Sequence, residues 1–99
     1  MNIMLSCCAG MSTSMLVEKM KQAAKAQGKD HKIWACSIEA IADNLDKCDV
    51  ILLGPQVRLE KDNVEKIANG KPVAVINAMD YGRLNGAGVV ATAEKLLEK

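Results

Sequence analysis

Short apolar runs alternate with segments of helical periodicity along the whole chain. Four runs are predicted to be strands because they are short, mostly apolar and bounded by turn-forming residues. They are Asn2–Cys7, Lys32–Cys36, Val50–Leu53 and Val73–Asn77. Every residue of Val50–Leu53 is apolar, which is typical of a strand buried on both faces of a parallel sheet.

A segment with helical spacing follows each predicted strand. The first helix is expected from about Thr13 to Gln27, with Ser12 as its N-cap and Gly28 as its stop. The second is expected to start after Ser37, and the third is expected to end near Gly70.

A polar turn at Asp80–Gly82 is predicted before the last helix, whose apolar stripe includes Val89, Val90 and Ala93. Four strand–helix units predict an α/β fold with a four-stranded parallel sheet and helices on both faces. Periodicity does not fix the strand order, and we expect the flavodoxin-like order 2-1-3-4. The connections are short, so residues 1–99 are expected to form a single domain.

This strand order predicts where a site should lie. The loop after Cys7, the turn at Gly54 and Pro55, and the segment Asp80–Gly82 would meet at the carboxyl edge of the sheet. Ligands prefer the crevice at this edge, where the strand order reverses. The functional site is therefore expected at the carboxyl edge of the sheet.

Composition and charge exclude several classes of function. The net charge is +1, Phe is absent and aromatic residues make up 2% of the chain, so the basic and stacking surfaces of a nucleic-acid-binding protein are missing. No segment approaches the ~20 apolar residues of a membrane span, and no signal peptide is visible. We expect a cytoplasmic monomer that does not insert into a membrane and that binds small molecules or proteins.

The four cysteines are Cys7, Cys8, Cys36 and Cys48. They form no CxxC pair, and no histidine lies at metal-ligand spacing. We therefore expect free thiols, no metal and no cofactor. Cys36 and Cys48 are expected to be small core or strand-end residues.

Cys7 lies where a strand stops and a helix is about to start. Backbone amides at a helix N-terminus have no partner within the helix, so they favour an anion and lower the pKa of a nearby thiol from its usual value of about 8.5. A phosphate bound to that sulfur would be wrapped by the loop that follows. The expected phosphate-binding loop consists of Cys8, Ala9, Gly10, Met11, Ser12, Thr13 and Ser14. From these residues alone, an ordinary buried cysteine followed by a helix N-cap remains an open alternative.

The string CCAGMSTSML closely resembles the phosphorylation loop of one family: the enzyme IIB components of the phosphoenolpyruvate-dependent sugar phosphotransferase system, lactose, cellobiose and chitobiose branch. That family has a CSAGMSTS-like loop after its first strand, an LLGPQ segment after its third strand and a YG turn before its last helix. Cys7 falls on the family's phosphocysteine. The other two motifs match Gly54, Pro55, Gln56 and Tyr81, which are expected at the site rim. Cys8 stands where the family usually has Ser.

The resemblance implies a phosphoryl relay. A phosphohistidine of enzyme IIA would donate to Cys7, and phospho-Cys7 would donate to a sugar, of the cellobiose or chitobiose type, bound by the membrane protein enzyme IIC. The residues do not discriminate among disaccharides.

Two other functions remain open alternatives. A thiol phosphatase or arsenate reductase would have a loop of similar shape, and Asp80 with Tyr81 could act as its general acid pair. Such phosphatases place an Arg six residues after the nucleophile, where this chain has Thr13, and this difference favours a carrier. A nucleotide-binding module is the weaker alternative, because the GxxxxGK[ST] loop is absent.

Overall fold

The computed structural model describes residues 1–6 and 10–97, without the side chains of residues 10–13. Four parallel strands form one sheet in the order β2-β1-β3-β4, so the expected strand order is confirmed. The strands are β1 (Asn2–Ser6), β2 (Lys32–Cys36), β3 (Val50–Leu53) and β4 (Val73–Val75). In the register of β1 with β2, Asn2 pairs with Lys32 at the amino end and Ser6 pairs with Cys36 at the carboxyl end.

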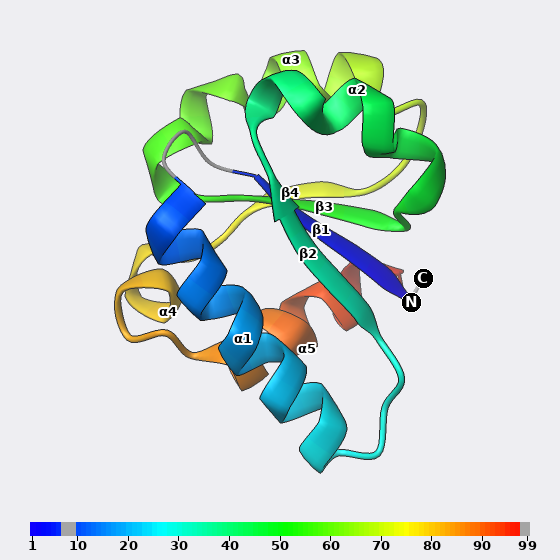
Figure 1. Cartoon of the computed structure of the whole chain (residues 1–99). Coiled ribbons are helices and arrows are strands. Elements are labelled where there is room, and N and C mark those ends of the chain that lie inside the picture. Colours follow the sequence, from blue (N-terminus) through cyan, green and yellow to red (C-terminus); the bar gives the residue numbers. More distant parts are fainter. Residues whose placement is uncertain (7–9, 98–99) are drawn as a thin grey trace.

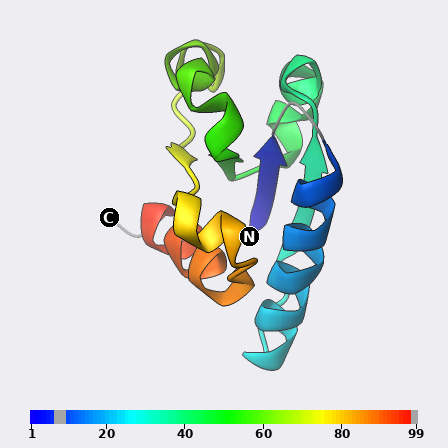
Figure 2. The same ribbon diagram turned by 90° about the vertical axis from the view of Figure 1, so that its left-hand side faces the viewer.

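Helices cover both faces of the sheet, as predicted (Figures 1 and 2). One face carries α1 (Gly10–Ala26), the short α4 (Ala78–Gly82) and α5 (Gly86–Leu97). The other face carries α2 (Ile41–Asn44) and α3 (Lys61–Ile67). Three 3-10 helices flank these last two: η1 (Ile38–Ala40), η2 (Leu45–Lys47) and η3 (Pro55–Glu60).

Alternate residues of each central strand supply two separate cores. Ile3 and Leu5 of β1 pack with the apolar stripes of α1 and α5, in a cluster that includes Leu16 and Val89. Met4 faces the opposite side and packs with residues that include Ile41. The period-2 alternation of side chains therefore fills both faces, which explains why the central strands are apolar at nearly every position.

The ends of the first helix differ in how well they were predicted. Helix α1 already begins at Gly10, so Ser12 lies inside the helix and its prediction as the N-cap is wrong. At the other end Gly28 has a φ of 71°, and its N–H donates to the carbonyl of Lys25 over 3.0 Å. Glycine adopts this left-handed conformation at little cost, so its predicted role as the helix stop is confirmed.

Asn77 was expected to end the fourth strand, but β4 stops at Val75 and Asn77 is the N-cap of α4. Its side-chain Oδ1 accepts the N–H of Met79 over 2.8 Å. The expected polar turn at Asp80–Gly82 is consequently part of a short helix, which corrects that prediction. The capping hydrogen bond of Asn77 favours the start of a helix, and this effect outweighs the tendency of the apolar run to continue as a strand.

Two further segments differ in detail from the sequence prediction. Ser37 precedes η1, but its side chain makes no capping hydrogen bond, and the expected second helix is divided into η1, α2 and η2. The expected loop after Gly54 contains η3, which starts at Pro55. Proline is favoured at the first helical position because its fixed φ suits a helix and its missing N–H needs no partner there.

Candidate functional site

The carboxyl edge of the sheet brings the ends of β1 and β3 together with the start of α1. Strand β1 ends at Ser6 and helix α1 begins at Gly10. The predicted nucleophile Cys7 and its neighbours Cys8 and Ala9 lie outside the described residues. Because only these three residues join Ser6 to Gly10, the position of Cys7 along the chain is between a strand end and a helix start.

Ser6 connects the end of β1 to both neighbouring strands. It is fully buried, and its Oγ donates a hydrogen bond to the backbone carbonyl of Cys36 over 3.0 Å. Its own backbone carbonyl accepts the N–H of Gly54 over 2.9 Å. The residue immediately before Cys7 is thus held from two sides.

The N-terminus of α1 suits an anion. The helix has 17 residues and no acidic residue in its first turn. Its first backbone N–H groups have no intrahelical partner, and the helix dipole places partial positive charge at this end. An anion at the carboxyl edge would therefore meet favourable charge without a competing carboxylate from that turn.

The predicted rim residues of the third strand lie beside the end of β1. Gly54 is buried, Pro55 is half-buried and Gln56 is exposed. The hydrogen bond from the Gly54 N–H to the Ser6 carbonyl places this turn next to Ser6, the residue before Cys7. A role of Gly54, Pro55 and Gln56 in binding remains a prediction.

Tyr81 and its neighbour Asp80 do not form an exposed acid pair. Tyr81 is only 8% exposed and packs in the core that also contains Leu16 and Val89. The Asp80 carboxylate accepts a hydrogen bond from the Asn85 side-chain amide over 3.1 Å. This arrangement weakens the feature that favoured a phosphatase.

The two described cysteines are free thiols with no sign of activation. Burial raises the pKa of the Cys36 thiol, and the nearby Cys48 adds to this effect. Burial likewise raises the pKa of the Cys48 thiol and outweighs the opposing effect of Lys71. Both side chains therefore remain protonated near neutral pH, which makes them weak nucleophiles.

Sequence reasoning gave no role to Ser6 or Asn77, although both shape this edge. The signal for Asn77 was present, since Asn at an N-cap with an acidic residue three positions later, here Asp80, resembles a capping box. Ser6 had no comparable signal: a serine at the end of an apolar run does not reveal that a neighbouring carbonyl will lie within reach.

A strand order that reverses beside the start of α1 defines a doubly wound α/β protein, a class in which ligands generally bind at the carboxyl edge of the sheet. Residues 2–92 match the family model described as "PTS system, Lactose/Cellobiose specific IIB subunit". The chain belongs to this IIB family of the sugar phosphotransferase system, whose members work with a IIC component in the membrane. None of the described helices is long and apolar enough to cross a membrane.

Curated relatives cover nearly the whole chain. The galactose-specific EIIB component of Lactococcus lactis subsp. cremoris and the cellobiose-specific EIIB component of Lactococcus lactis subsp. lactis are each 48% identical over 102 residues, covering 96% of this chain and 94% of theirs. The oligo-beta-mannoside-specific EIIB component of Bacillus subtilis is 37% identical over 97 residues, with the same coverage.

Two solved structures share the fold. The cellobiose-specific IIB component from Borrelia burgdorferi is 41% identical, with a TM-score of 0.82 over 97% of this chain and 90% of that one. The lactose-specific IIB domain from Streptococcus pneumoniae has a TM-score of 0.83 over 94% of this chain and 96% of that one, at 18% identity. The latter likeness concerns the fold alone.

Proposed function

We propose that Cys7 carries the phosphoryl group in the relay, taking it from a phosphohistidine of enzyme IIA and giving it to a sugar bound by enzyme IIC. The observation that carries this proposal is the start of α1 at Gly10, three residues after Cys7. Helix-terminal amides at this distance favour a thiolate before transfer and a phosphate dianion after it. Gly10 to Ser14 of the expected phosphate-binding loop lie in α1, so the amides of Cys8, Ala9 and the first turn of α1 would bind the phosphate.

The phosphoryl group would be transferred in two displacement reactions. In the first, the Cys7 thiolate attacks phosphorus, an S–P bond forms, the N–P bond of phosphohistidine breaks and the imidazole takes up a proton. In the second, a sugar hydroxyl attacks phosphorus, an O–P bond forms and the S–P bond breaks. The hydroxyl proton leaves to a base or to water, and Cys7 returns as a thiolate.

A carrier must keep its phosphoryl group until the acceptor arrives. Thr13 occupies the position where thiol phosphatases have a clamping Arg, so transition-state charge in an attack by water would lack a bidentate partner. Tyr81 is buried and the Asp80 carboxylate accepts a hydrogen bond from Asn85, which makes the two residues a less suitable acid pair. These features support transfer over hydrolysis.

We further propose cellobiose, or a similar β-linked disaccharide, as the sugar, and a cytoplasmic monomer of one domain as the working form. The names of the relatives support a sugar of this kind but differ among themselves. The relay itself requires access to a soluble donor on one side of the membrane. Exchange of the IIC partner, with this chain held constant, would show whether IIC sets the choice of sugar.

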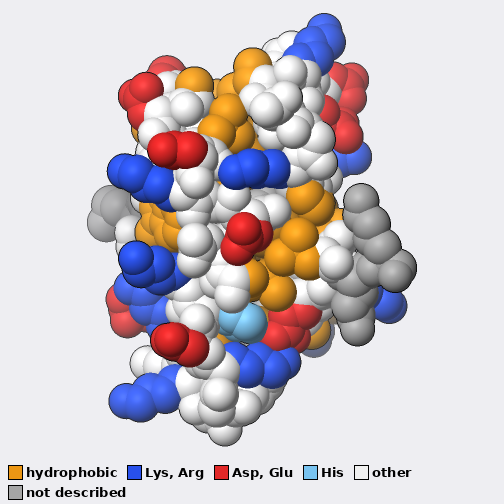
Figure 3. Space-filling model, turned by 90° about the vertical axis from the view of Figure 1, so that its right-hand side faces the viewer, with side chains coloured by type: hydrophobic (Ala, Val, Ile, Leu, Met, Phe, Trp, Pro, Cys, Tyr) orange, Lys and Arg blue, Asp and Glu red, His pale blue; other side chains and the backbone are white. Residues whose placement is uncertain are grey.

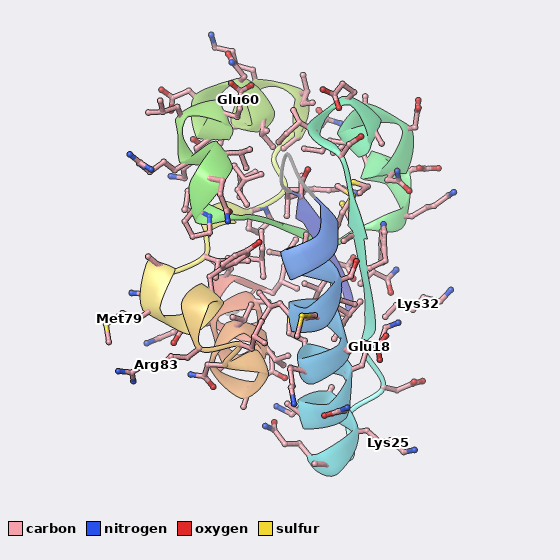
Figure 4. All side chains as sticks on the ribbon, turned by 60° about the vertical axis from the view of Figure 1, so that its left-hand side comes forward. Glu18, Lys25, Lys32, Glu60, Met79 and Arg83 are labelled. Atoms are coloured by element: carbon pink, nitrogen blue, oxygen red, sulfur yellow. The ribbon has the colours of Figure 1, made fainter. Side chains whose placement is uncertain are left out.

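Exposed apolar side chains around the carboxyl edge offer a docking rim for IIA and IIC. Met15 of α1 is 58% exposed, Leu59 of η3 is 85% exposed and Met79 of α4 is 60% exposed. Met79 extends away from the body of the protein (Figure 4). Flexible or branched apolar side chains around a polar loop provide adaptable contacts for two successive partners.

The test is sugar phosphorylation in a reconstituted relay with matched single variants. Cys7→Ser should abolish sugar phosphorylation, whereas Cys8→Ser should retain most of it, because only Cys7 is proposed to bind phosphorus covalently. Circular dichroism would verify that both variants are folded. Full activity of the Cys7→Ser protein would overturn the proposal.

A further inference from the structure

A hollow lies at the amino edge of the sheet, opposite the edge at which α1 begins. It has a volume of about 550 Å³ and is lined by Asn2, Lys32, Ile33, Trp34, Asn44 and Lys47. This volume falls within the ~300–1,000 Å³ typical of small-molecule sites. Asn2 and Lys32 start their strands, whereas Ser6, which precedes Cys7, ends β1. The hollow is therefore separate from the phosphoryl-transfer site.

The charges of this hollow favour an anion. Lys32 and Lys47 are both exposed, and neither forms an ion pair with a carboxylate in the part of the chain that the structure describes. Lys32 extends outward from β2 (Figure 4). The Asp49 carboxylate, which accepts the backbone N–H of Asn2 over 2.7 Å, does not line the hollow. The lining thus carries two ammonium groups and no carboxylate, which suits an anionic group such as a phosphate.

The two asparagine side chains are held in fixed orientations. The Asn2 amide nitrogen donates to the carbonyl of Lys47 over 2.8 Å, and the Asn44 amide nitrogen donates to the carbonyl of Ala40 over 2.8 Å. Their amide oxygens accept no hydrogen bond from any residue that the structure describes. Each oxygen can therefore accept a hydrogen bond from a ligand hydroxyl.

Trp34 adds an apolar surface to the same hollow. Its side chain is half-buried, with one part packed on the core that contains Met4 and Ile51 and another part lining the hollow. On this side of the molecule basic and acidic side chains both lie close to hydrophobic ones (Figure 3). An aromatic face can cover the C–H face of a ring while the polar edge of that ring contacts amides.

We propose that this hollow binds a phosphorylated sugar. The lysines would hold the phosphate, the asparagine oxygens would accept hydroxyl hydrogen bonds, and Trp34 would pack against the ring. The site does not depend on Cys7, so its occupation is independent of whether the chain carries a phosphoryl group by the proposed mechanism.

Trp34 is the only tryptophan of the chain, so its fluorescence reports directly on this hollow. The full chain would be titrated with glucose 6-phosphate, glucose, inorganic phosphate and adenosine monophosphate. Glucose 6-phosphate should give a saturable change, with an affinity at least about tenfold higher than that of glucose or phosphate alone, because it engages both parts of the hollow. Cys7→Ser should leave this binding unchanged, whatever it does to phosphoryl transfer.

Matched lysine variants test the assignment. Lys32→Gln and Lys47→Gln should each weaken glucose 6-phosphate binding about five- to tenfold, since each removes one charge-assisted hydrogen bond. Lys66→Gln, an exposed lysine on α3, should not change it. The proposal is overturned by no saturable response, by equal weakening in all three variants, by equal affinity for inorganic phosphate, or by a preference for adenosine monophosphate.

Discussion

At the scale of single residues, the sequence places Cys7 at a strand end but cannot reveal the hydrogen bonds that fix that end. Ser6 connects β1 to both neighbouring strands through its hydroxyl and its carbonyl. Cys36 is buried enough to remain a protonated thiol, which its position in the sequence did not show. Motif spacing predicts which residue reacts, whereas burial and hydrogen bonding depend on the packed neighbours of that residue.

Alkylation rates should separate the cysteines. Near neutral pH, Cys7 should react with iodoacetamide faster than Cys36 and Cys48, whose pKa values are raised by burial. The alkylation rates of Cys36 and Cys48 should rise only as the pH approaches the raised pKa values of these two thiols. Peptide mapping after short exposure measures all four thiols at once, and equal rates would contradict an activated Cys7.

Removing the Ser6 hydroxyl should destabilise the fold. Ser6→Ala deletes the donor to the Cys36 carbonyl at a buried position, which costs about 1 kcal/mol of unfolding free energy. Urea unfolding followed by circular dichroism measures this change. The matched control is Ser37→Ala, because the exposed Ser37 side chain makes no capping hydrogen bond. A Ser6→Ala protein as stable as the control would show that this hydrogen bond contributes nothing.

At the scale of secondary-structure elements, apolar periodicity predicted the strands and long helices but not the short segments between them. β2 and β3 have the predicted bounds because polar or turn-forming residues flank both strands: His31 and Ser37 for β2, Asp49 and Gly54 for β3. Helix α4 was missed because its five residues are too few to show a helical period, and it depends on the Asn77 cap.

The contact between α1 and α5 requires a glycine at position 86. A Cβ built on Gly86 would lie 2.4 Å from the backbone carbonyl carbon of Lys19, so a methyl group can be fitted only if one helix moves. Gly86→Ala should therefore cost about 1–3 kcal/mol of unfolding free energy. Gly82→Ala is the control, because a Cβ there meets nothing within 4 Å. Equal stability of the two variants in thermal unfolding would contradict this close packing.

At the scale of the whole molecule, a polar cluster connects the chain's N-terminus to its last helix. The His31 Nε2 lies 2.9 Å from the Glu94 carboxylate, and the His31 Nδ1 lies 3.1 Å from the Met1 amine. Lys29 also pairs with Glu94, at 2.5 Å. These contacts give His31 a structural role at the amino edge of the sheet, away from the start of α1.

Glu94 should make the stability of the fold dependent on pH in the acid range. The hydrogen bond from Lys29, and then that from His31, hold the pKa of Glu94 below its usual value of 4.5. A carboxyl group whose pKa is lowered by folding stabilises the folded state when the pH is above its pKa in the unfolded state. This stabilisation is lost as the pH falls through its pKa in the folded state.

The corresponding variant is Glu94→Gln. It should lower stability at pH 7 by less than about 1 kcal/mol, because the pair is partly exposed, and the difference should shrink as the pH is lowered below 4.5. Glu39→Gln changes an exposed carboxylate of η1 and should have little effect. Urea denaturation at several pH values measures the free energy of unfolding of both variants. A loss of stability in Glu94→Gln that does not change with pH would contradict an electrostatic origin.

The location of the phosphoryl group tests the central claim most directly. The chain would be incubated with a phosphohistidine relay, and the gain of one phosphoryl group, about 80 Da, would be mapped by mass spectrometry without acid exposure. The account predicts the added mass on Cys7, and its loss when the IIC protein and cellobiose are added. A stable adduct on Cys8 or on another residue, or no adduct with a competent donor, would contradict it.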